Sequence, residues 1–315
     1  MNRLILLCSL LLSVVQPVLA KDYKIGLSVW SDYPDSVSGF KQALAEHGFK
    51  EGINVEYLLR NAHANADKQT KIAEEFKNAK LDLVYSLTTP GTIIIKRALD
   101  SAIPIVFSIV TYPADAGLIE SFDYSGNNLV GTSNFVPLRH YIQLLSTLVP
   151  KTKTVAIFHR KGEPNSKMQT INLARLLRRQ GIEVLIRQPQ NIQQVTQMAQ
   201  ALVGKANVFV TTTDTLMQSG GEKALIDVSK QYNIPILSSN KQGIVQGATF
   251  GPVADFFILG KMSGNMAAQI LSGQSAPSKL QSKYQNPPTI LINAKRAKAL
   301  NITIPDTLKG VVYVE

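Results

Sequence analysis

The chain has 315 residues, of which 45% are hydrophobic and 17% are charged, and its net charge is +11. This is the composition of a globular protein with enough chain for one large or two medium domains. The basic residues are scattered, and the densest cluster, Arg175, Arg178 and Arg179, has the spacing of a solvated helix face without interleaved aromatic residues. The charge pattern therefore argues against a nucleic-acid partner.

The first twenty residues have the pattern of a secretory signal peptide. A short basic start ending at Arg3 precedes an apolar block over residues 4–15, and Val18-Leu19-Ala20 is a small-residue cleavage pattern. The block is too short for a membrane-spanning helix. Cys8, the single cysteine, lies inside it, so we expect no lipid anchor. Cleavage after Ala20 leaves a cysteine-free chain suited to the periplasm.

The remaining chain contains one strand–helix unit written twice. The first copy has expected strands at 23–30, 53–59, 81–87 and 103–110, with an amphipathic helix at 37–49. The second copy has expected strands at 154–160, 182–189, 207–212 and 234–239. Gly48 and Gly181 end the first helix of each copy, and Pro104 and Pro235 open the last strand of each copy. The similar order and spacing indicate an internal repeat.

Alternating strands and helices predict an α/β protein with two doubly wound, mostly parallel sheets. We expect two lobes joined by a hinge, with chain crossings near residues 134, 248 and 282. The first lobe then comprises residues 21–134 plus about 249–281, and the second comprises 135–248 plus about 282–315. Lobes that close freely on each other make a monomer the expected state.

Hydroxyl side chains follow corresponding strands in both copies. Thr88 and Thr89 precede Pro90 after the strand at 81–87, and residues 212–214 are Thr-Thr-Asp after the strand at 207–212. Ligands bind at the carboxyl edge of parallel sheets, where hydroxyls and free N–H groups at a helix start can hold an anion. Helix capping is the simpler explanation for any one Thr. Matched Thr runs on both lobes favour a ligand site in a cleft between them.

Several stretches resemble the substrate-binding proteins of ABC transporters with the periplasmic-binding type I fold, in particular the tryptophan- and phenylalanine-binding branch. The resemblance spans nearly the whole mature chain and rests on the order and spacing of "GFKQALAEHGFKEGINVEY", "KLDLVYSLTTPGT", "IPIVFSIVTYPADAGLIES", "GNNLVGTSNF", "GEPNS" and "NAKRAKALNITIP". It implies a hinged protein that closes on a small solute and docks on an ABC permease in the inner membrane.

The resemblance also implies roles for single residues. Thr88 and Thr89 would receive a ligand carboxylate, Asn165 and Ser166 would add donors, and Asp214 would pair with an α-ammonium group. A helix cap is an equally good interpretation of Asp214. Two departures from the family pattern leave the solute open, because this chain has Tyr112-Pro113 and Asp32-Tyr33-Pro34 where other motifs are usual.

Aromatic residues at strand ends are candidates for the walls of the cleft. Trp30, the single tryptophan, ends the first strand, Tyr33 comes shortly after it, and Tyr112 follows the strand at 103–110. A tryptophan is more often part of a core, but these positions favour a ring-bearing or flat ligand, an amino acid or similar carboxylate. Thr213 and Asn240 complete the predicted ligand-binding set.

The sequence gives little support for catalysis. The four histidines, at positions 47, 63, 140 and 159, lack metal-ligand spacing, and no nucleophile elbow, Walker loop or dinucleotide motif is present. We expect a non-enzymatic protein without a metal or cofactor. Two functions stay open: the solute receptor of an ABC importer, or a periplasmic sensor that reports its ligand to a membrane signalling protein.

Overall fold

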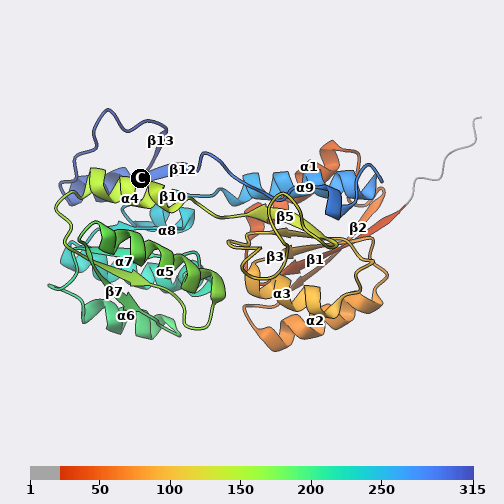
Figure 1. Cartoon of the computed structure of the whole chain (residues 1–315), viewed down its shortest axis with the longest axis horizontal. Helices are drawn as coiled ribbons and strands as arrows, with labels where there is room; N and C mark the ends of the chain where they lie inside the picture. The colour runs from red at the N-terminus through yellow and green to blue at the C-terminus, as the bar shows by residue number, and fades with distance from the viewer. Residues whose placement is uncertain (1–21) are drawn as a thin grey trace, which may run out of the picture.

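The computed structural model describes residues 22–315, which form two α/β lobes side by side along the long axis of the molecule (Figure 1). The predicted signal peptide and Cys8 lie outside the described residues. Within residues 22–315, no helix combines the length and apolar character that crossing a membrane requires.

The first lobe is built on a six-stranded sheet in the order β11-β5-β4-β3-β1-β2, and all of its neighbouring strands are parallel. Its strands are β1 (Tyr23–Val29), β2 (Val55–Asn61), β3 (Leu83–Leu87), β4 (Ile105–Ser108), β5 (Leu129–Ser133) and β11 (Lys283–Tyr284). Strands β3, β4 and β5 are buried along their whole length. Their apolar runs reflect a sheet that is covered on both faces.

Four helices cover this sheet. Successive apolar side chains along its strands point to opposite faces and pack against the helices there. The pairs are α1 (Pro34–Glu46) with α9 (Phe256–Leu271) on one face and α2 (Ala66–Asn78) with α3 (Thr89–Ala98) on the other (Figure 1). Phe40 of α1 stacks on Tyr85 of β3 with ring centroids 3.9 Å apart. The sheet is therefore the middle layer of a three-layer lobe.

The second lobe has a seven-stranded sheet in the order β13-β12-β10-β9-β8-β6-β7, in which only the pair β10–β12 is antiparallel among the described strands. Its strands are β6 (Thr154–Phe158), β7 (Glu183–Arg187), β8 (Val208–Thr211), β9 (Ile236–Leu237), β10 (Phe250–Val253), β12 (Thr289–Asn293) and β13 (Val311–Val314). Its helices are α4 (Leu138–Leu148), α5 (Pro164–Arg179), α6 (Ile192–Gln200), α7 (Glu222–Tyr232), α8 (Lys241–Gln246) and α10 (Ala294–Ala299). One core packs against α4 and α5 and the other against α6, α7 and α8.

The two sheets confirm the fold class and the repeat. The order β2-β1-β3-β4 in the first lobe has its counterpart in β7-β6-β8-β9 in the second. Two lobes of doubly wound parallel sheet are thus present, as the alternating pattern predicts.

Three connections join the lobes, and two of them differ from the expected positions. The first, at 134–137 between β5 and α4, lies where the sequence places it. The second follows Val253 instead of residue 248, because β10 pairs with β9 and β12 in the second sheet. The third follows Tyr284 instead of residue 281, because β11 pairs with β5 in the first sheet. The lobes are therefore 22–134 with about 255–285, and 135–254 with about 286–315.

Helices α1 and α9 approach so closely that glycine is required at their contact. A Cβ at Gly260 would lie 2.1 Å from the carbonyl oxygen of Ser36, and one at Gly39 would lie 2.2 Å from that of Phe257. Neither backbone oxygen can move without shifting a whole helix. The contact fixes α1, which begins directly after Tyr33 at the border of the cleft.

Gly260→Ala should therefore destabilise the protein by about 1–3 kcal/mol, the usual effect of overpacking. Urea unfolding followed by circular dichroism measures this change. Ile258→Ala, at a 42% exposed position of the same helix, is the control and should change the free energy of unfolding far less. Equal effects of the two substitutions would contradict the close-contact explanation.

Candidate ligand-binding cleft

A small cavity lies between the two lobes at the carboxyl ends of their strands. Its volume is about 10 Å³, which is space for one water molecule. Both lobes contribute to its wall: Tyr33, Thr88, Thr89, Pro90, Ile109 and Asn134 from the first, and Glu163, Asn165, Thr213, Thr215 and Gln218 from the second. The lobes thus stand in a closed arrangement, and a larger solute requires them to separate slightly.

The start of helix α3 forms the first-lobe wall. Thr88 has φ 71° and ψ 158°, a backbone conformation that is almost restricted to glycine, and its hydroxyl accepts a hydrogen bond from the Gly91 N–H at 3.4 Å. Ile109, at the end of the adjacent strand β4, also has a positive φ of 57°. Strain of about 1–3 kcal/mol per residue is typical of functional sites and here aims the α3 N-terminus at the cavity.

The second-lobe wall comes from the start of α5 and the turn after β8. Gln169 Oε1 accepts hydrogen bonds from the Thr213 N–H at 2.9 Å and the Thr213 hydroxyl at 3.0 Å. Asn165 Nδ2 donates to the Thr213 carbonyl. The Glu163 carboxylate, which is 6% exposed, accepts from Thr215 and pairs with Arg160 at 3.2 Å. A carboxylate that is paired with Arg160 therefore lies at the cavity, opposite α3.

Two buried polar atoms of the cavity lining have no hydrogen-bond partner among residues 22–315. The Thr89 hydroxyl and the Asn165 Oδ1 atom are buried and make no hydrogen bond within the described chain. One belongs to each lobe, and both residues line the cavity. Buried polar groups are nearly always paired, so these two are free to contact a ligand.

Asp214 lies differently from the prediction. Its Oδ1 accepts from the Met217 N–H at 2.8 Å, and its Oδ2 accepts from the Arg160 N–H and the Thr212 hydroxyl, each at 3.0 Å. It is 1% exposed and does not line the cavity. Burial, with a smaller contribution from nearby Glu163, raises the pKa of Asp214 to about 7. The structure therefore favours the capping interpretation of Asp214.

Glu163 is the acidic group that sequence analysis missed. It belongs to the "GEPNS" stretch, from which only Asn165 and Ser166 were selected. Ser166 lies under the α5 N-terminus, where its hydroxyl donates to the Glu163 carbonyl at 3.3 Å, and it does not line the cavity. The available signal was the position of Glu163 directly before Pro164, the first residue of α5.

The other predicted residues divide between the cleft and its surroundings. Trp30 is 5% exposed and packs in the core beneath α3, so it supports the wall from behind. Tyr112 packs edge-on against Phe135 beside the first hinge connection, at 5.6 Å between ring centroids. Asn240 caps α8 and lines a separate hollow of about 260 Å³ that adjoins Tyr33 and Gln218. Trp30, Tyr112 and Asn240 do not border the small cavity between the lobes.

Direct hydrogen bonds hold the lobes together around the cavity. The cross-lobe pairs are Tyr33–Gln218 at 2.8 Å, Thr111–Thr213 at 3.2 Å and Ser31–Ser219 at 3.3 Å. Gln218 and Ser219 belong to a kinked segment, Met217–Gly221, which precedes α7 and in which Ser219 and Gly220 have non-helical backbone angles. Burial raises the pKa of Tyr33, so its hydroxyl keeps its proton and donates to Gln218 Oε1.

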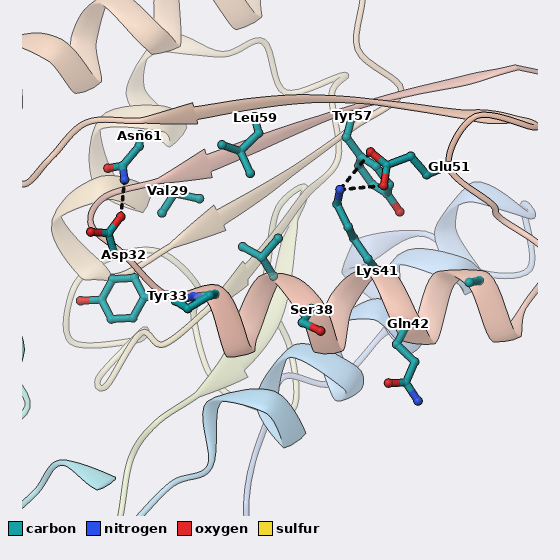
Figure 2. Close-up of a pocket in the computed structure, with 13 residues that line it drawn as sticks. Val29, Asp32, Tyr33, Ser38, Lys41, Gln42, Glu51, Tyr57, Leu59 and Asn61 are labelled. Carbon is teal, nitrogen blue, oxygen red and sulfur yellow. Dashed lines mark hydrogen bonds and ion pairs between the residues drawn. The ribbon is translucent and has the colours of Figure 1, made fainter. Parts of the chain in front are cut away.

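A larger, open groove of about 790 Å³ lies on the first lobe between α1 and edge strand β2 (Figure 2). Tyr33 stands near one end, beside the Asp32–Asn61 hydrogen bond, and the Lys41–Glu51 ion pair crosses it farther along (Figure 2). Only the first lobe lines this groove. Among residues 22–315, no group of three or more acidic, His or Cys side chains is arranged to hold a metal ion.

The two similar lobes, the hinge connections and the shared polar cavity define a two-lobed solute-binding protein of the periplasmic-binding type I fold. A family model for ABC transporter substrate binding proteins matches residues 32–311. A curated tyrosine-binding protein of Clostridioides difficile is 30% identical over 285 residues, which are 90% of this chain and 82% of the relative. The chain belongs to the family of ABC transporter substrate binding proteins.

Solved structures agree with this fold. An ABC domain from Streptococcus pneumoniae in complex with L-Trp has a TM-score of 0.87 at 24% identity, with 94% of this chain and all of that chain covered. The ligand-free, open structure of a substrate binding protein with adhesive properties from Clostridium difficile has a TM-score of 0.73 at 29% identity, covering 93% and 99% of the two chains.

Tyr33→Phe should shift the lobes toward an open arrangement. It removes one cross-lobe hydrogen bond, worth about 1 kcal/mol, and should lower the closed-to-open ratio about 5-fold. Small-angle X-ray scattering of the ligand-free protein measures the change as a larger radius of gyration. Tyr57→Phe is the matched control, because the Tyr57 hydroxyl has no hydrogen-bond partner among residues 22–315. An equal expansion of both variants would contradict the assigned role of the Tyr33–Gln218 hydrogen bond.

A second buried carboxyl predicts a pH dependence of stability. Glu222 is 1% exposed and accepts hydrogen bonds from Thr211 and Asn240, and burial raises its pKa from 4.5 to about 7. The folded state therefore holds this proton more tightly than the unfolded chain, and the resulting stability is lost as the pH rises from about 4.5 to about 7.

Glu222→Gln removes this titration. Relative to the parent protein, the variant should gain roughly 3 kcal/mol of unfolding free energy between pH 4 and pH 8. Urea unfolding at both pH values tests it. Asp227→Asn, which removes an exposed carboxylate, is the control. A pH-independent difference between the Gln variant and the parent would contradict the assigned role of burial.

Proposed function

We propose that the protein is the periplasmic solute receptor of an ABC importer and that it binds an amino acid with an aromatic side chain between its lobes. The observation that carries the proposal is the cavity itself, where the strained start of α3 with its unpartnered Thr89 hydroxyl faces the Glu163 carboxylate of the other lobe. An anion site opposite an anion is the arrangement that a zwitterion requires.

The α-carboxylate is assigned to the first lobe. The N-terminus of α3 carries a partial positive charge, and the Thr89 hydroxyl can donate to a carboxylate oxygen. The α-ammonium is assigned to the second lobe, where Glu163 and the Asn165 Oδ1 atom both accept hydrogen bonds. The ligand would thereby join the two lobes, which gives closure its driving force.

An aromatic side chain is supported by the relatives and by the surrounding rings. One relative is described as tyrosine-binding and one structural neighbour contains L-Trp. Tyr33 borders the cavity and packs edge-on to Phe256 at 5.8 Å between ring centroids. Each charge-assisted hydrogen bond supplies about 1.5–3 kcal/mol, whereas micromolar affinity needs about 8 kcal/mol. Burial of a ring would supply the difference.

The family supports the proposed location and partner. Substrate-binding proteins of ABC transporters are extracytoplasmic, and the family interacts with transporter permeases. In our proposal residues 1–20 direct export and are removed, and the mature protein works as a monomer that delivers its solute to a permease in the inner membrane. The protein carries out no catalysis in this scheme.

Isothermal titration with L-tyrosine and with desaminotyrosine, which lacks the amino group, tests the assigned roles. Glu163→Gln should weaken L-tyrosine binding about 10- to 100-fold, the loss of one charge-assisted contact, and leave desaminotyrosine binding unchanged. Thr89→Val should weaken both ligands, because both carry the carboxylate.

Asp227→Asn controls for removing a carboxylate away from the cleft and should change neither affinity. L-Tryptophan and L-phenylalanine extend the series. The proposal fails if the parent protein binds none of these amino acids, and the assignment of Glu163 fails if its Gln variant loses both tyrosine ligands equally.

A further inference from the structure

The net positive charge of the protein belongs to one lobe. Residues 22–134 and 255–285 carry 13 Lys and Arg against 15 Asp and Glu, a net charge of −2. Residues 135–254 and 286–315 carry 18 against 7, a net charge of +11. Three of those seven acids, Glu163, Asp214 and Glu222, are buried, so four remain to balance the surface of the second lobe.

Six exposed bases gather at the amino ends of the second sheet, in loops and helix ends that enter β6, β7, β8 and β9. We call this set the basic cap, and it consists of Lys151, Lys153, Arg178, Arg179, Lys205 and Lys230. Backbone contacts hold the loops together, because Asn207 Oδ1 accepts from the Lys153 N–H at 2.9 Å and the Glu183 N–H donates to the Lys153 carbonyl at 2.9 Å. No cap residue forms an ion pair within residues 22–315.

The basic cap is not a general consequence of the fold. Basic residues at helix C-termini complement the helix dipole, which explains the positions on α5 and α7. It does not explain Lys151, Lys153 and Lys205, which lie outside helices. In the first lobe, the corresponding loops mix charges, with Glu51 before β2 and Asp82 and Asp100 before β3 and β4.

The position of the basic cap separates it from the cleft. The cleft lies at the carboxyl ends of the strands, and the cap lies at their amino ends, at the end of the second lobe that faces away from the first (Figure 1). No cap residue lines any of the hollows described above. A diffuse set of unpaired charges without a groove suits a broad anionic surface better than a shaped peptide.

We propose that the basic cap binds the anionic headgroup surface of a phospholipid bilayer. Clustered bases near an anionic membrane are attracted by its surface potential, an attraction that falls off within a Debye length. Binding end-on would stand the long axis of the molecule upright, with the hinge and cleft above the surface. The protein would then be held near the membrane by charge, without an anchor, while its lobes stay free to open and close.

Cosedimentation with phosphatidylcholine vesicles that contain increasing phosphatidylglycerol tests the proposal, with the chain lacking residues 1–20. Binding should rise with phosphatidylglycerol and fall with salt. The triple variant Lys151→Gln, Arg179→Gln, Lys205→Gln should lower the partition coefficient about 100-fold, from roughly 1 kcal/mol per charge at 1.4 kcal/mol per tenfold change.

The matched control removes three exposed bases from α2 of the first lobe, Lys68→Gln, Lys71→Gln and Lys77→Gln, and should bind vesicles like the parent. Both triple variants should keep the thermal stability of the parent. Absence of vesicle binding, or equal losses in both triple variants, would overturn the proposal. Binding to poly-L-glutamate but not to vesicles would assign the cap to an acidic protein and also overturn it.

Discussion

The structure depends on the meeting of two sheet edges. Strands β1–β4 of the first lobe are parallel to one another, and so are strands β6–β9 of the second. All the strand-to-helix turns of these strands therefore lie at the carboxyl edge of their sheet. The duplication turns both such edges toward each other, so polar turns of two lobes share one cavity. The strained backbone at Thr88 and Ile109 is kept because buried strands β3 and β4 fix the residues on either side.

Few direct side-chain contacts hold the two lobes in the closed arrangement. Three side-chain hydrogen bonds cross between the lobes around the cavity, and each contributes about 1 kcal/mol in net terms. One partly exposed ion pair, Lys241–Asp255, also joins the lobes, at the start of α9. Such a balance can be shifted by a ligand that contacts both lobes, since the shift equals its differential affinity for the two arrangements. The close contact of α1 with α9 is different, because it leaves α1 no room to shift and so holds Tyr33, directly before α1, in place for its hydrogen bond to Gln218.

Periodicity and the repeat were enough to predict the lobes, the sheet type and the position of Thr88, Thr89 and Thr213, since these follow from where parallel strands end. Asn165 was expected only from the family resemblance. The sequence did not show to which lobe β10 and β11 belong. Their lobe is set by the strands that they pair with, β9 and β12 for β10 and β5 for β11, and this pairing forms only in the folded protein. The choice between Asp214 and Glu163 also depended on tertiary structure. Both follow strands of the second lobe, and only the orientation of backbone N–H groups around Asp214 shows that it caps its own turn. Trp30 and Tyr112 have the right sequence positions, but packing turns them into the core and the hinge.

In our proposal, one zwitterion is held between α3 of the first lobe and Glu163 of the second. A crystal structure of the protein grown with L-tyrosine tests this most directly. The ligand should lie between the lobes, with its carboxylate at hydrogen-bond distance from the Thr89 hydroxyl and its ammonium at hydrogen-bond distance from Glu163. A ligand in the groove between α1 and β2, or one whose ammonium contacts Asp214 instead of Glu163, would contradict it.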